Sequence, residues 1–341
     1  MSDVRYLTSR DVAELATMEE YIAAVRDGFR QRGEGAAADQ PDLAANAEGT
    51  VGLVSYCATL PDQEVFGGYM FTTGPDATDG YYLMGLFDCT NGEPLAVMDG
   101  ASWNPYKTGA AGAVGVDELA REDASSIGII GSGAQARGQI RAIAEVRDLE
   151  TGFVFSPTPE NRESFATEMG ELLDIDITPT ESAEAFVSDV DIVVTATKSS
   201  TPVLDGSLLS PGTHVNAVGT GGAANREVDA TTVARSKFVP DHKTRGYEDS
   251  GEYVQAIEEG AIDKDHLHAS LAEVVAGVAP GRESDDEITL FDSSGTGVET
   301  TAAAYLLFDR AVSADVGSVV EMTSATSGFA MTGFSKAKSD K

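Results

Sequence analysis

The sequence predicts an α/β protein whose larger part is a doubly wound parallel sheet, and three observations lead to this prediction. After Arg121, short apolar runs alternate with helical segments, which is the order of a parallel sheet covered by helices on both faces. The earlier stretch 49–97 carries short alternating runs divided by Gly, Pro, Asp and Asn, which predict an antiparallel sheet. At 341 residues, the chain is long enough for two domains with separate cores.

A helix is predicted over 8–30, close to the N-terminus. Thr8 or Ser9 can cap its first turn. The apolar residues that recur at helical spacing are Val12, Leu15, Met18, Ile22, Val25 and Phe29. Further along, the stretch 107–120, "KTGAAGAVGVDELA", is rich in small residues and predicts a helix that packs closely against its neighbour.

Six apolar runs after Arg121 are predicted to form the parallel strands. They are Ile127–Ile130, Phe153–Phe155, Asp191–Thr197, His214–Val218, Phe238–Val239 and Ile288–Phe291. Helical stretches fill most of the gaps between them. A last helix is predicted from Val298 to about Val312, and we expect the Gly- and Ser-containing tail behind it to fray.

The first of these strands leads directly into a glycine-rich turn. Gly131, Gly133 and Ala136 form a G-x-G-x-x-A pattern at the start of a helix. The free N–H groups and the positive dipole end of that helix suit a pyrophosphate, and the glycines let the backbone approach it. The pattern follows a strand, opens a helix and begins a βα series, which is the context that dinucleotide binding requires. The sequence therefore predicts a Rossmann-type domain that binds NAD or NADP.

The end of the second strand bears on the choice between the two cofactors. In "FVFSPTPENR", Ser156 stands where an acidic residue usually accepts hydrogen bonds from the ribose of NAD. The missing carboxylate and the nearby Arg162 lean towards NADP, while NAD stays open. The chain has no G-x-S-x-G elbow, Walker A lysine or H-E-x-x-H motif, so hydrolase and phosphotransferase functions lack support.

The composition predicts a folded protein with an acidic surface. The chain carries 56 acidic and 23 basic residues, a formal net charge of -33, and 42% hydrophobic residues. Such a field repels nucleic acid and anionic lipid, so we expect neither as a partner. Scattered acidic side chains with little lysine resemble the surfaces of proteins from extreme halophiles. We therefore expect stable folding only in molar salt, and a melting curve indifferent to KCl would contradict this.

No stretch of the sequence is predicted to enter a membrane. The N-terminal "MSDVRYLTSRDVAEL" lacks an apolar signal core, and no window approaches 18 uninterrupted apolar residues. Cys57 and Cys89 are too few and too far apart for a disulfide framework or a metal knuckle. We expect two reduced thiols, a cytoplasmic location and no metal site.

Several stretches together resemble the ornithine cyclodeaminase and mu-crystallin family. They are "NGEPLAVMDG", "GIIGSGAQARGQIRAI", "DIVVTATKSSTPVL", "PGTHVNAVGTGG", "EDSGEYVQAIEEGAI", "VVAGVAPGR" and "ITLFDSSGTG", in the family's order over roughly residues 10–310. The resemblance implies a discontinuous α+β substrate and dimerisation domain, residues 1–120 plus 300–341, and an NAD(P)-binding Rossmann domain, residues 121–299. It also implies a homodimer formed through the outer sheet, and a small-molecule substrate.

The resemblance also implies which residues bind the cofactor. Ala134 and Gln135 would lie on the pyrophosphate and Ser156 near the adenosine ribose, while Thr197 and the strand end Val215–Val218 would flank the nicotinamide half. The full set is Thr108, Gly131, Gly133, Ala134, Gln135, Ser156, Thr197, Val215, Asn216, Ala217, Val218, Asn225 and Ser293. Most of these lie at the carboxyl ends of parallel strands, where such sheets bind ligands.

Four positions depart from the family pattern where the substrate is handled. The family's strand lysine corresponds to Tyr69, its helix arginine to Lys107, its proton-shuttling aspartate to Gly221 and its early arginine to Asp42. An aspartate repels a substrate carboxylate, and a lysine offers a point charge instead of a bidentate fork. Without the shuttling aspartate, cyclodeaminase chemistry should be disabled.

The leading hypothesis is an NAD(P)-dependent oxidoreductase acting on a small imino or oxo acid, of the amino acid dehydrogenase or ketimine reductase type. Lys107 is the predicted electrostatic anchor and Tyr69 the candidate proton donor. Two alternatives stay open: an ornithine cyclodeaminase or alanine dehydrogenase with a rearranged site, and a non-catalytic NAD(P)-binding sensor or ligand carrier. A shift of one or two residues in the loop 219–226 would let Glu227 or Asp229 supply the missing carboxylate.

Overall fold

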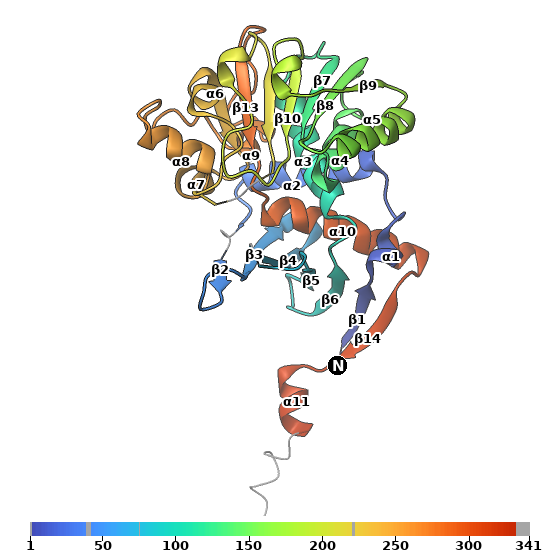
Figure 1. The fold of residues 1–341 in the computed structure, drawn as a ribbon. Helices are drawn as coiled ribbons and strands as arrows, with labels where there is room; N and C mark the ends of the chain where they lie inside the picture. Colours follow the sequence, from blue (N-terminus) through green and yellow to red (C-terminus); the bar gives the residue numbers. More distant parts are fainter. Residues whose placement is uncertain (1, 39–41, 75, 220–221, 332–341) are drawn as a thin grey trace, which may run out of the picture.

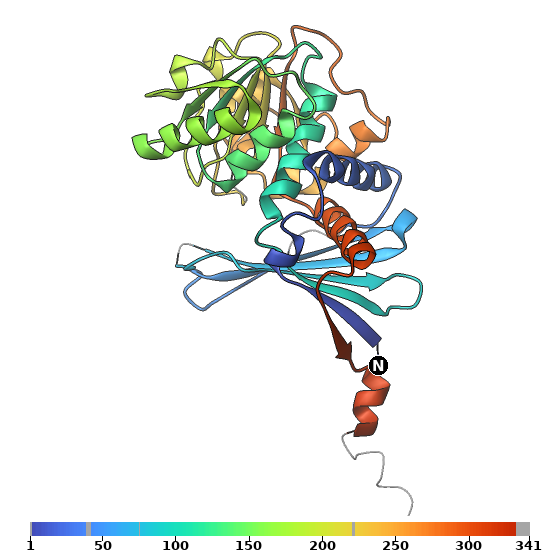
Figure 2. The same ribbon diagram turned by 90° about the vertical axis from the view of Figure 1, so that its right-hand side faces the viewer.

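The computed structural model consists of two seven-stranded sheets with helices packed between them (Figures 1 and 2). It describes residues 2–38, 42–74, 76–219 and 222–331. The outer sheet has the order β14-β1-β6-β5-β4-β3-β2, and the second has the order β12-β13-β11-β10-β7-β8-β9. Among the described residues, no helix is both long and apolar enough to cross a membrane.

The outer sheet is mixed. Its strands are β1 (Ser2–Leu7), β2 (Asp42–Ala45), β3 (Gly52–Leu60), β4 (Val65–Thr73), β5 (Tyr82–Asp88), β6 (Pro94–Asp99) and β14 (Ser318–Met322). Strands β2 to β6 pair antiparallel, as the alternating runs of 49–97 predict, whereas β1 runs parallel to β6. The expectation of a frayed tail is wrong for 318–322, which form the strand β14. Strand β14 is an edge of this sheet; its backbone groups hydrogen-bond to the unpredicted strand β1, and α11 (Ala325–Met331) follows.

The helix predicted over 8–30 is two helices, α1 (Ser9–Val12) and α2 (Met18–Gly33). Each has its own capping box, in which a threonine and an acidic residue three positions later satisfy each other's backbone N–H groups. Thr17 therefore starts a new helix inside a stretch whose apolar spacing looks continuous.

Helices α2, α3 (Asn104–Leu119) and α10 (Gly297–Ala314) lie between the two sheets, which Figure 2 shows from the side. The small residues of α3 allow very close packing, as predicted for 107–120. A side chain at Gly109 would collide with the backbone of Gly138, and one at Gly112 would collide with Gln139. Both contacts join α3 to α4 (Ala134–Ile143), the helix that follows the glycine-rich turn.

The second sheet is entirely parallel. Its strands are β7 (Ser126–Ile130), β8 (Thr151–Phe155), β9 (Asp176–Pro179), β10 (Ile192–Thr195), β11 (His214–Ala217), β12 (Ser236–Pro240) and β13 (Ile288–Asp292). The helices that accompany it are α5 (Pro159–Leu173), α6 (Ala230–Arg235), α7 (Lys243–Glu248), α8 (Gly251–Glu258) and α9 (Leu271–Val275). All six predicted runs form strands, while β9 escaped prediction because only Ile177 of its four residues is buried.

Short 3-10 helices, Pro61–Gln63, Ala183–Ala185 and Gly206–Leu208, complete the described elements. The chain passes from one sheet to the other in the segments 120–125 and 293–296, next to the predicted domain boundaries. Helix α10 packs against α2 and against β3 and β4 of the outer sheet. The loop that precedes α10 therefore lies where the two sheets face each other.

Candidate active site

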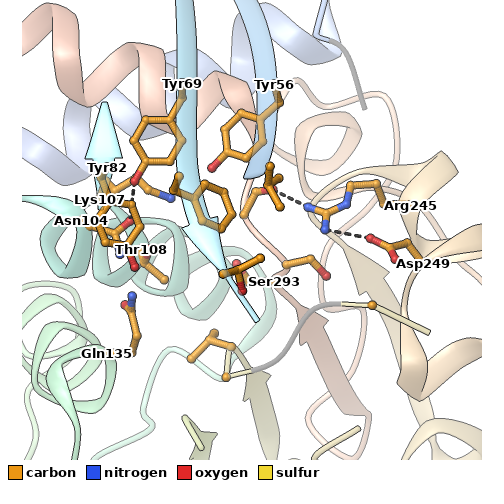
Figure 3. Close-up of a pocket in the computed structure, with 18 of the residues that line it drawn as sticks. Tyr56, Tyr69, Tyr82, Asn104, Lys107, Thr108, Gln135, Arg245, Asp249 and Ser293 are labelled. Atoms are coloured by element: carbon orange, nitrogen blue, oxygen red, sulfur yellow. Dashed lines mark hydrogen bonds and ion pairs between the residues drawn. The ribbon is translucent and has the colours of Figure 1, made fainter. Parts of the chain in front are cut away.

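A cavity of about 620 Å³ lies between the two sheets, and residues of both line it (Figure 3). The outer sheet contributes an aromatic wall of Tyr56, Tyr69, Phe71 and Tyr82. The same sheet adds Leu43, Val54 and Thr73. The rest of the lining comes from α3, from the start of α4, from the segments after β11 and β13, and from α7 and the residue after it: Asn104, Lys107, Thr108, Gln135, Val218, Gly219, Gly222, Arg245, Glu248, Asp249, Ser293, Ser294 and Gly295. The carboxyl ends of the parallel strands thus open into the cavity, as expected for this sheet type.

The glycine-rich turn is built to accept a dinucleotide. Gly131 has a φ of +116°, and a side chain there would collide with the carbonyl oxygen of Ala196, so this position requires glycine. At Gly133, the N-cap of α4, an added Cβ would meet nothing within 4 Å. This open space in front of the α4 N-terminus, beside Ala134, fits a pyrophosphate.

Besides Arg245, whose Nε is described below, two lining side chains carry buried polar atoms without a partner among the described residues. They are Oε1 of Gln135, in the first turn of α4, and Oγ of Ser293, directly after β13. Buried polar atoms are normally hydrogen-bonded, so these atoms indicate a polar ligand in the cavity. Together with Thr108, which faces them from α3, they fit the nicotinamide half of NAD(P).

The predicted adenosine-side residue Ser156 follows β8 directly. Its Oγ accepts a hydrogen bond from Ser132 at 3.1 Å and donates one to the Thr158 carbonyl at 3.3 Å. Arg162 donates from Nη1 to the Ser156 carbonyl at 3.0 Å. The polar neighbours of this position are thus hydroxyls and a guanidinium. The lean towards NADP stays a prediction.

The predicted strand end Val215–Val218 divides into two parts. Val218 lines the cavity. Val215 and Ala217 are buried in the core of the parallel sheet instead, and the Asn216 amide donates to the Gly112 carbonyl and to Gln139, both at 3.1 Å. These three residues support the sheet and α3, because side chains within a strand alternate between its two faces and only the strand end borders the cavity.

Glu227 does not supply a catalytic carboxylate. It is fully buried and accepts hydrogen bonds from Thr195 Oγ1 at 3.0 Å, from the Thr197 N–H at 2.6 Å and from the Gly219 N–H at 2.7 Å. Burial raises its pKa, although these bonds act in the opposite direction. Asp229 caps α6. The structure therefore gives both carboxylates a supporting role, and Glu227 joins the ends of β10 and β11.

The predicted cofactor residues Thr197 and Asn225 lie near this junction. Thr197 Oγ1 accepts a hydrogen bond from the Ser199 N–H at 3.0 Å, in the loop after β10. The backbone of Asn225 contacts Gly251 at the start of α8, and Asn225 does not line the cavity. Their proposed contacts with NAD(P) stay predictions.

Tyr69 belongs to the aromatic wall, but its environment does not favour proton donation. The side chain is almost completely buried, and its hydroxyl donates to Asn104 Oδ1 at 3.3 Å. Burial, followed by the neighbouring hydroxyls of Tyr56 and Tyr82, raises the pKa of Tyr69 far above its usual value. A phenol with a raised pKa holds its proton more tightly than free tyrosine does.

Lys107 forms a buried ion pair with a residue that sequence reasoning missed. Lys107 Nζ donates to Glu299 Oε1 at 2.5 Å, and the two side chains are 3% and 0% exposed. Burial acts to lower the pKa of Lys107, but the charge of Glu299 and the hydroxyl of Tyr56 outweigh it and the net pKa is raised. Glu299 Oε2 is buried and has no hydrogen-bond partner among the described residues.

Arg245, on α7, is a second missed residue in the cavity wall. Its Nη1 donates to the Gly295 carbonyl at 2.5 Å and its Nη2 to Asp249 Oδ2 at 3.0 Å. Asp241 accepts a hydrogen bond from the Gly295 N–H at 2.6 Å. The stretch "DHKTRGYEDSGEY" contains no motif that identifies Arg245 as a site residue. The only signal was its position shortly after β12, at the carboxyl end of a parallel strand.

The other two departures from the family pattern lie elsewhere. Asp42 is exposed at the start of β2, an edge strand, and does not line the cavity. Gly221 lies outside the described residues. No group of three or more His, Cys, Asp or Glu side chains within the described ranges is arranged to hold a metal ion.

Comparisons with known proteins agree with this geometry. The alanine dehydrogenase of Archaeoglobus fulgidus is 32% identical over 330 residues, which cover 92% of this chain and 97% of that protein. Thermococcus litoralis Delta(1)-pyrroline-2-carboxylate reductase, solved with NADH and L-proline, superposes with a TM-score of 0.89 at 35% identity, covering 93% and 100% of the two chains. An archaeal alanine dehydrogenase dimer with bound NAD gives 0.88 at 30% identity, covering 94% and 100%.

The predicted fold class and family are confirmed by these matches. A family model described as "Ornithine cyclodeaminase/mu-crystallin family" matches residues 3–315, from β1 to the end of α10. The match therefore includes both sheets and the cavity between them, well beyond the nucleotide turn. On this ground the chain belongs to the ornithine cyclodeaminase/mu-crystallin family.

Proposed function

We propose that the protein is an NAD(P)H-dependent reductase of small imino acids, with cyclic ones such as Delta(1)-pyrroline-2-carboxylate as the first candidates. The observation that carries the proposal is the buried Lys107–Glu299 pair, which faces the same cavity as the nucleotide turn. The solved relative that holds NADH and L-proline supports the choice of a cyclic substrate. An oxidoreductase role is favoured over a cyclodeaminase or a non-catalytic carrier.

Reduction of an imine adds a hydride to the carbon and a proton to the nitrogen of its C=N bond. When bound, the reduced nicotinamide supplies the hydride to the imine carbon. Lys107 is held as an ammonium by Glu299 and donates its proton to the imine nitrogen. The raised pKa makes Lys107 a weaker acid than free lysine, so the transfer depends on the basicity of the amine that forms, which is about that of a lysine side chain. Glu299 keeps the charge of Lys107 in place within the low-dielectric cavity.

The aromatic wall supports a flat, ring-shaped substrate. Tyr69 and Tyr82 stack with ring centroids 5.9 Å apart, and Phe71 and Tyr82 stack at 5.7 Å. Such a surface excludes water and gives a planar imine a face to pack on. In this proposal, Tyr69 shapes the pocket and the proton comes from Lys107.

The test is a spectrophotometric assay of NADH and NADPH oxidation in ~2 M KCl, where the repulsion within a highly charged surface is screened. We expect oxidation with Delta(1)-pyrroline-2-carboxylate and formation of proline, and faster turnover with NADPH than with NADH. Pyruvate with ammonia tests the alanine dehydrogenase alternative, and proline formation from ornithine tests the cyclodeaminase. Cofactor binding without turnover of any of these compounds would favour the carrier hypothesis.

A homodimer formed through the outer sheet is also part of the proposal. The face of this sheet that points away from the helices exposes large apolar side chains: Leu53, Phe66, Met70, Leu83 and Phe87. Apolar surface on that scale favours a second protein chain as its cover. Light scattering of Phe66→Asp/Met70→Asp should give a monomer. Leu172→Asp, at an exposed apolar position on α5, should leave the dimer intact. The proposed cytoplasmic location is tested by cell fractionation.

A further inference from the structure

The proposed function leaves open how the substrate's carboxylate is held. In this chain, the charge of Lys107 is matched by Glu299 at 2.5 Å, so little of it remains for a second carboxylate. Asp42, which stands where the family has an arginine, is an exposed anion outside the cavity. The described cavity lining has one other cationic side chain, Arg245.

Arg245 lies across the cavity from the proton donor. A single residue, Gly295, lies between them: its carbonyl accepts from Arg245 Nη1, and a Cβ at Gly295 would lie 3.7 Å from Lys107 Nζ and 3.6 Å from Glu299 Oε1. Gly295 has a φ of +86°, a conformation that glycine adopts without strain. Figure 3 shows Arg245 and Lys107 on opposite sides of the cavity, with Ser293 below them.

The guanidinium is buried and keeps donors available. Its side chain is 8% exposed, and Nε has no hydrogen-bond partner among the described residues. A guanidinium has five N–H donors, and the two hydrogen bonds described above occupy only part of them. A buried guanidinium with a free N–H edge is the group best suited to bind a carboxylate with two parallel hydrogen bonds.

The charge of the buried Asp241 also acts on Arg245, but the carboxylate that forms an ion pair with it is one that a substrate can replace. Asp249 lies four residues further along the chain, just after α7, and its side chain is 41% exposed. Ion pairs with a partner this exposed contribute little to stability, because water solvates the separated charges. A substrate carboxylate in the cavity can therefore take over the guanidinium while Asp249 turns to solvent.

We propose that Arg245 binds the carboxylate of the imino acid and makes the enzyme selective for substrates that carry one. This proposal rests on the proposed function. It orients the substrate with its carboxylate towards α7 and its imine nitrogen towards Lys107. The ring then lies along the aromatic wall.

The experiment measures binding of pyrrole-2-carboxylate, a planar ring acid that cannot be reduced in this way, to the complex of the full chain with oxidised cofactor. Calorimetry compares wild type, Arg245→Met, Arg245→Lys and Lys243→Met. Lys243→Met is the control: it removes the same charge from the same helix, but Lys243 is exposed and does not line the cavity. Binding of reduced cofactor, followed by nicotinamide fluorescence, checks that each variant is folded.

We expect Arg245→Met to weaken pyrrole-2-carboxylate by about 100-fold or more, because a buried charge-assisted pair is lost. The affinity of Arg245→Lys for pyrrole-2-carboxylate should lie between those of wild type and Arg245→Met, since lysine keeps the positive charge but cannot form two parallel hydrogen bonds. Lys243→Met should change binding less than about 3-fold. In steady-state assays, Arg245→Met should lower kcat/KM for Delta(1)-pyrroline-2-carboxylate mainly through KM, and should leave kcat/KM for Delta(1)-pyrroline, which lacks the carboxylate, nearly unchanged.

The two proposals fail in different ways. Wild-type affinity for pyrrole-2-carboxylate in a folded Arg245→Met variant overturns the role of Arg245, whatever the turnover. An Arg245-dependent affinity in a protein that reduces no imine supports the carboxylate site and overturns the reductase. Equal losses for Delta(1)-pyrroline and its carboxylate also overturn the role of Arg245, because a general structural defect affects both substrates.

Discussion

The two halves of the cavity are built by different means. The cofactor half is made from backbone: a left-handed glycine, the open N-terminus of α4 and the ends of parallel strands. The substrate half is made from side chains that pair across long stretches of sequence, such as Lys107 with Glu299, which are 192 residues apart. A binding site made from backbone groups is therefore determined by local sequence. A site made from side chains can change its residues while the fold around it stays the same.

The largest effect should come from breaking the buried ion pair. In Lys107→Met, the Glu299 carboxylate is left unpaired at 0% exposure, which should cost about 3–5 kcal/mol of unfolding free energy. Denaturant unfolding in high salt measures it. Arg310→Gln, which breaks the partly exposed pair with Glu20, should cost less than about 1 kcal/mol. Equal costs for the two variants would mean that the substrate half is not organised around this pair.

A smaller effect on stability is expected from the buried carboxyl group of Glu252, on α8. Burial, with the charge of Glu227 as a lesser cause, raises the pKa of Glu252 from 4.5 to about 7. The folded state therefore keeps a proton that the unfolded state releases above pH 4.5. The contribution of Glu252 to the free energy of unfolding is fully present below pH 4.5, falls as the pH rises through 7 and is level above, a loss of about 3 kcal/mol.

Glu252→Gln should flatten this decline, because its amide oxygen can still accept the Glu227 N–H bond that Glu252 accepts at 2.9 Å. Melting temperatures between pH 4.5 and 8 measure the slope. Glu258→Gln, at an exposed position on the same helix, is the matched control and should follow the wild-type curve. A wild-type slope in Glu252→Gln would assign the pH dependence to other groups.

The two glycines of the turn separate folding from cofactor binding. Gly131→Ala should destabilise the protein by about 1–3 kcal/mol, because its φ of +116° is strained for alanine and the new methyl group meets Ala196. Gly133→Ala has free space around its methyl group and should leave the melting temperature within a degree or two of wild type. It should still weaken NADH binding measurably, because the methyl group occupies the space proposed for the pyrophosphate. Unchanged binding would place the pyrophosphate elsewhere.

The smallest effect should be that of Tyr69→Phe. It removes one hydrogen bond, to Asn104 at 3.3 Å, which is worth about 0.5–1.5 kcal/mol. If Tyr69 only shapes the wall, kcat falls by less than about 5-fold, whereas loss of a general acid costs about 100-fold or more. Stopped-flow measurement of hydride transfer distinguishes the two. A large loss would restore Tyr69 as the proton donor.

The sequence was sufficient for six strands of the parallel sheet and for the glycine-rich turn, because each carries its signal within a few residues. It also located Lys107 and Tyr69. It could not reveal Glu299 or Arg245, since neither stands in a motif and each gains its role only when Gly295 brings α3, α7 and α10 together.

Two errors in the fold predicted from the sequence have the same origin. The break before Thr17 depends on a capping box inside a stretch of continuous apolar spacing. The strand β14 in the tail depends on pairing with β1, which is formed by residues 2–7 some 310 positions away. In both cases a local hydrogen-bonding group or a distant partner outweighs the pattern of apolar residues.

The close packing of α3 on α4 bears on how such a site can change its substrate during evolution. Because Gly109 and Gly138 bring the two helix backbones into contact, the start of α3, with Lys107 and Thr108, and the nucleotide turn form one mechanical unit. In the proposed reaction, the main chain of this unit would position Lys107 and the cofactor relative to each other. Arg245 lies on α7, outside this unit, so a substitution there would change the substrate half while leaving the α3–α4 contact in place.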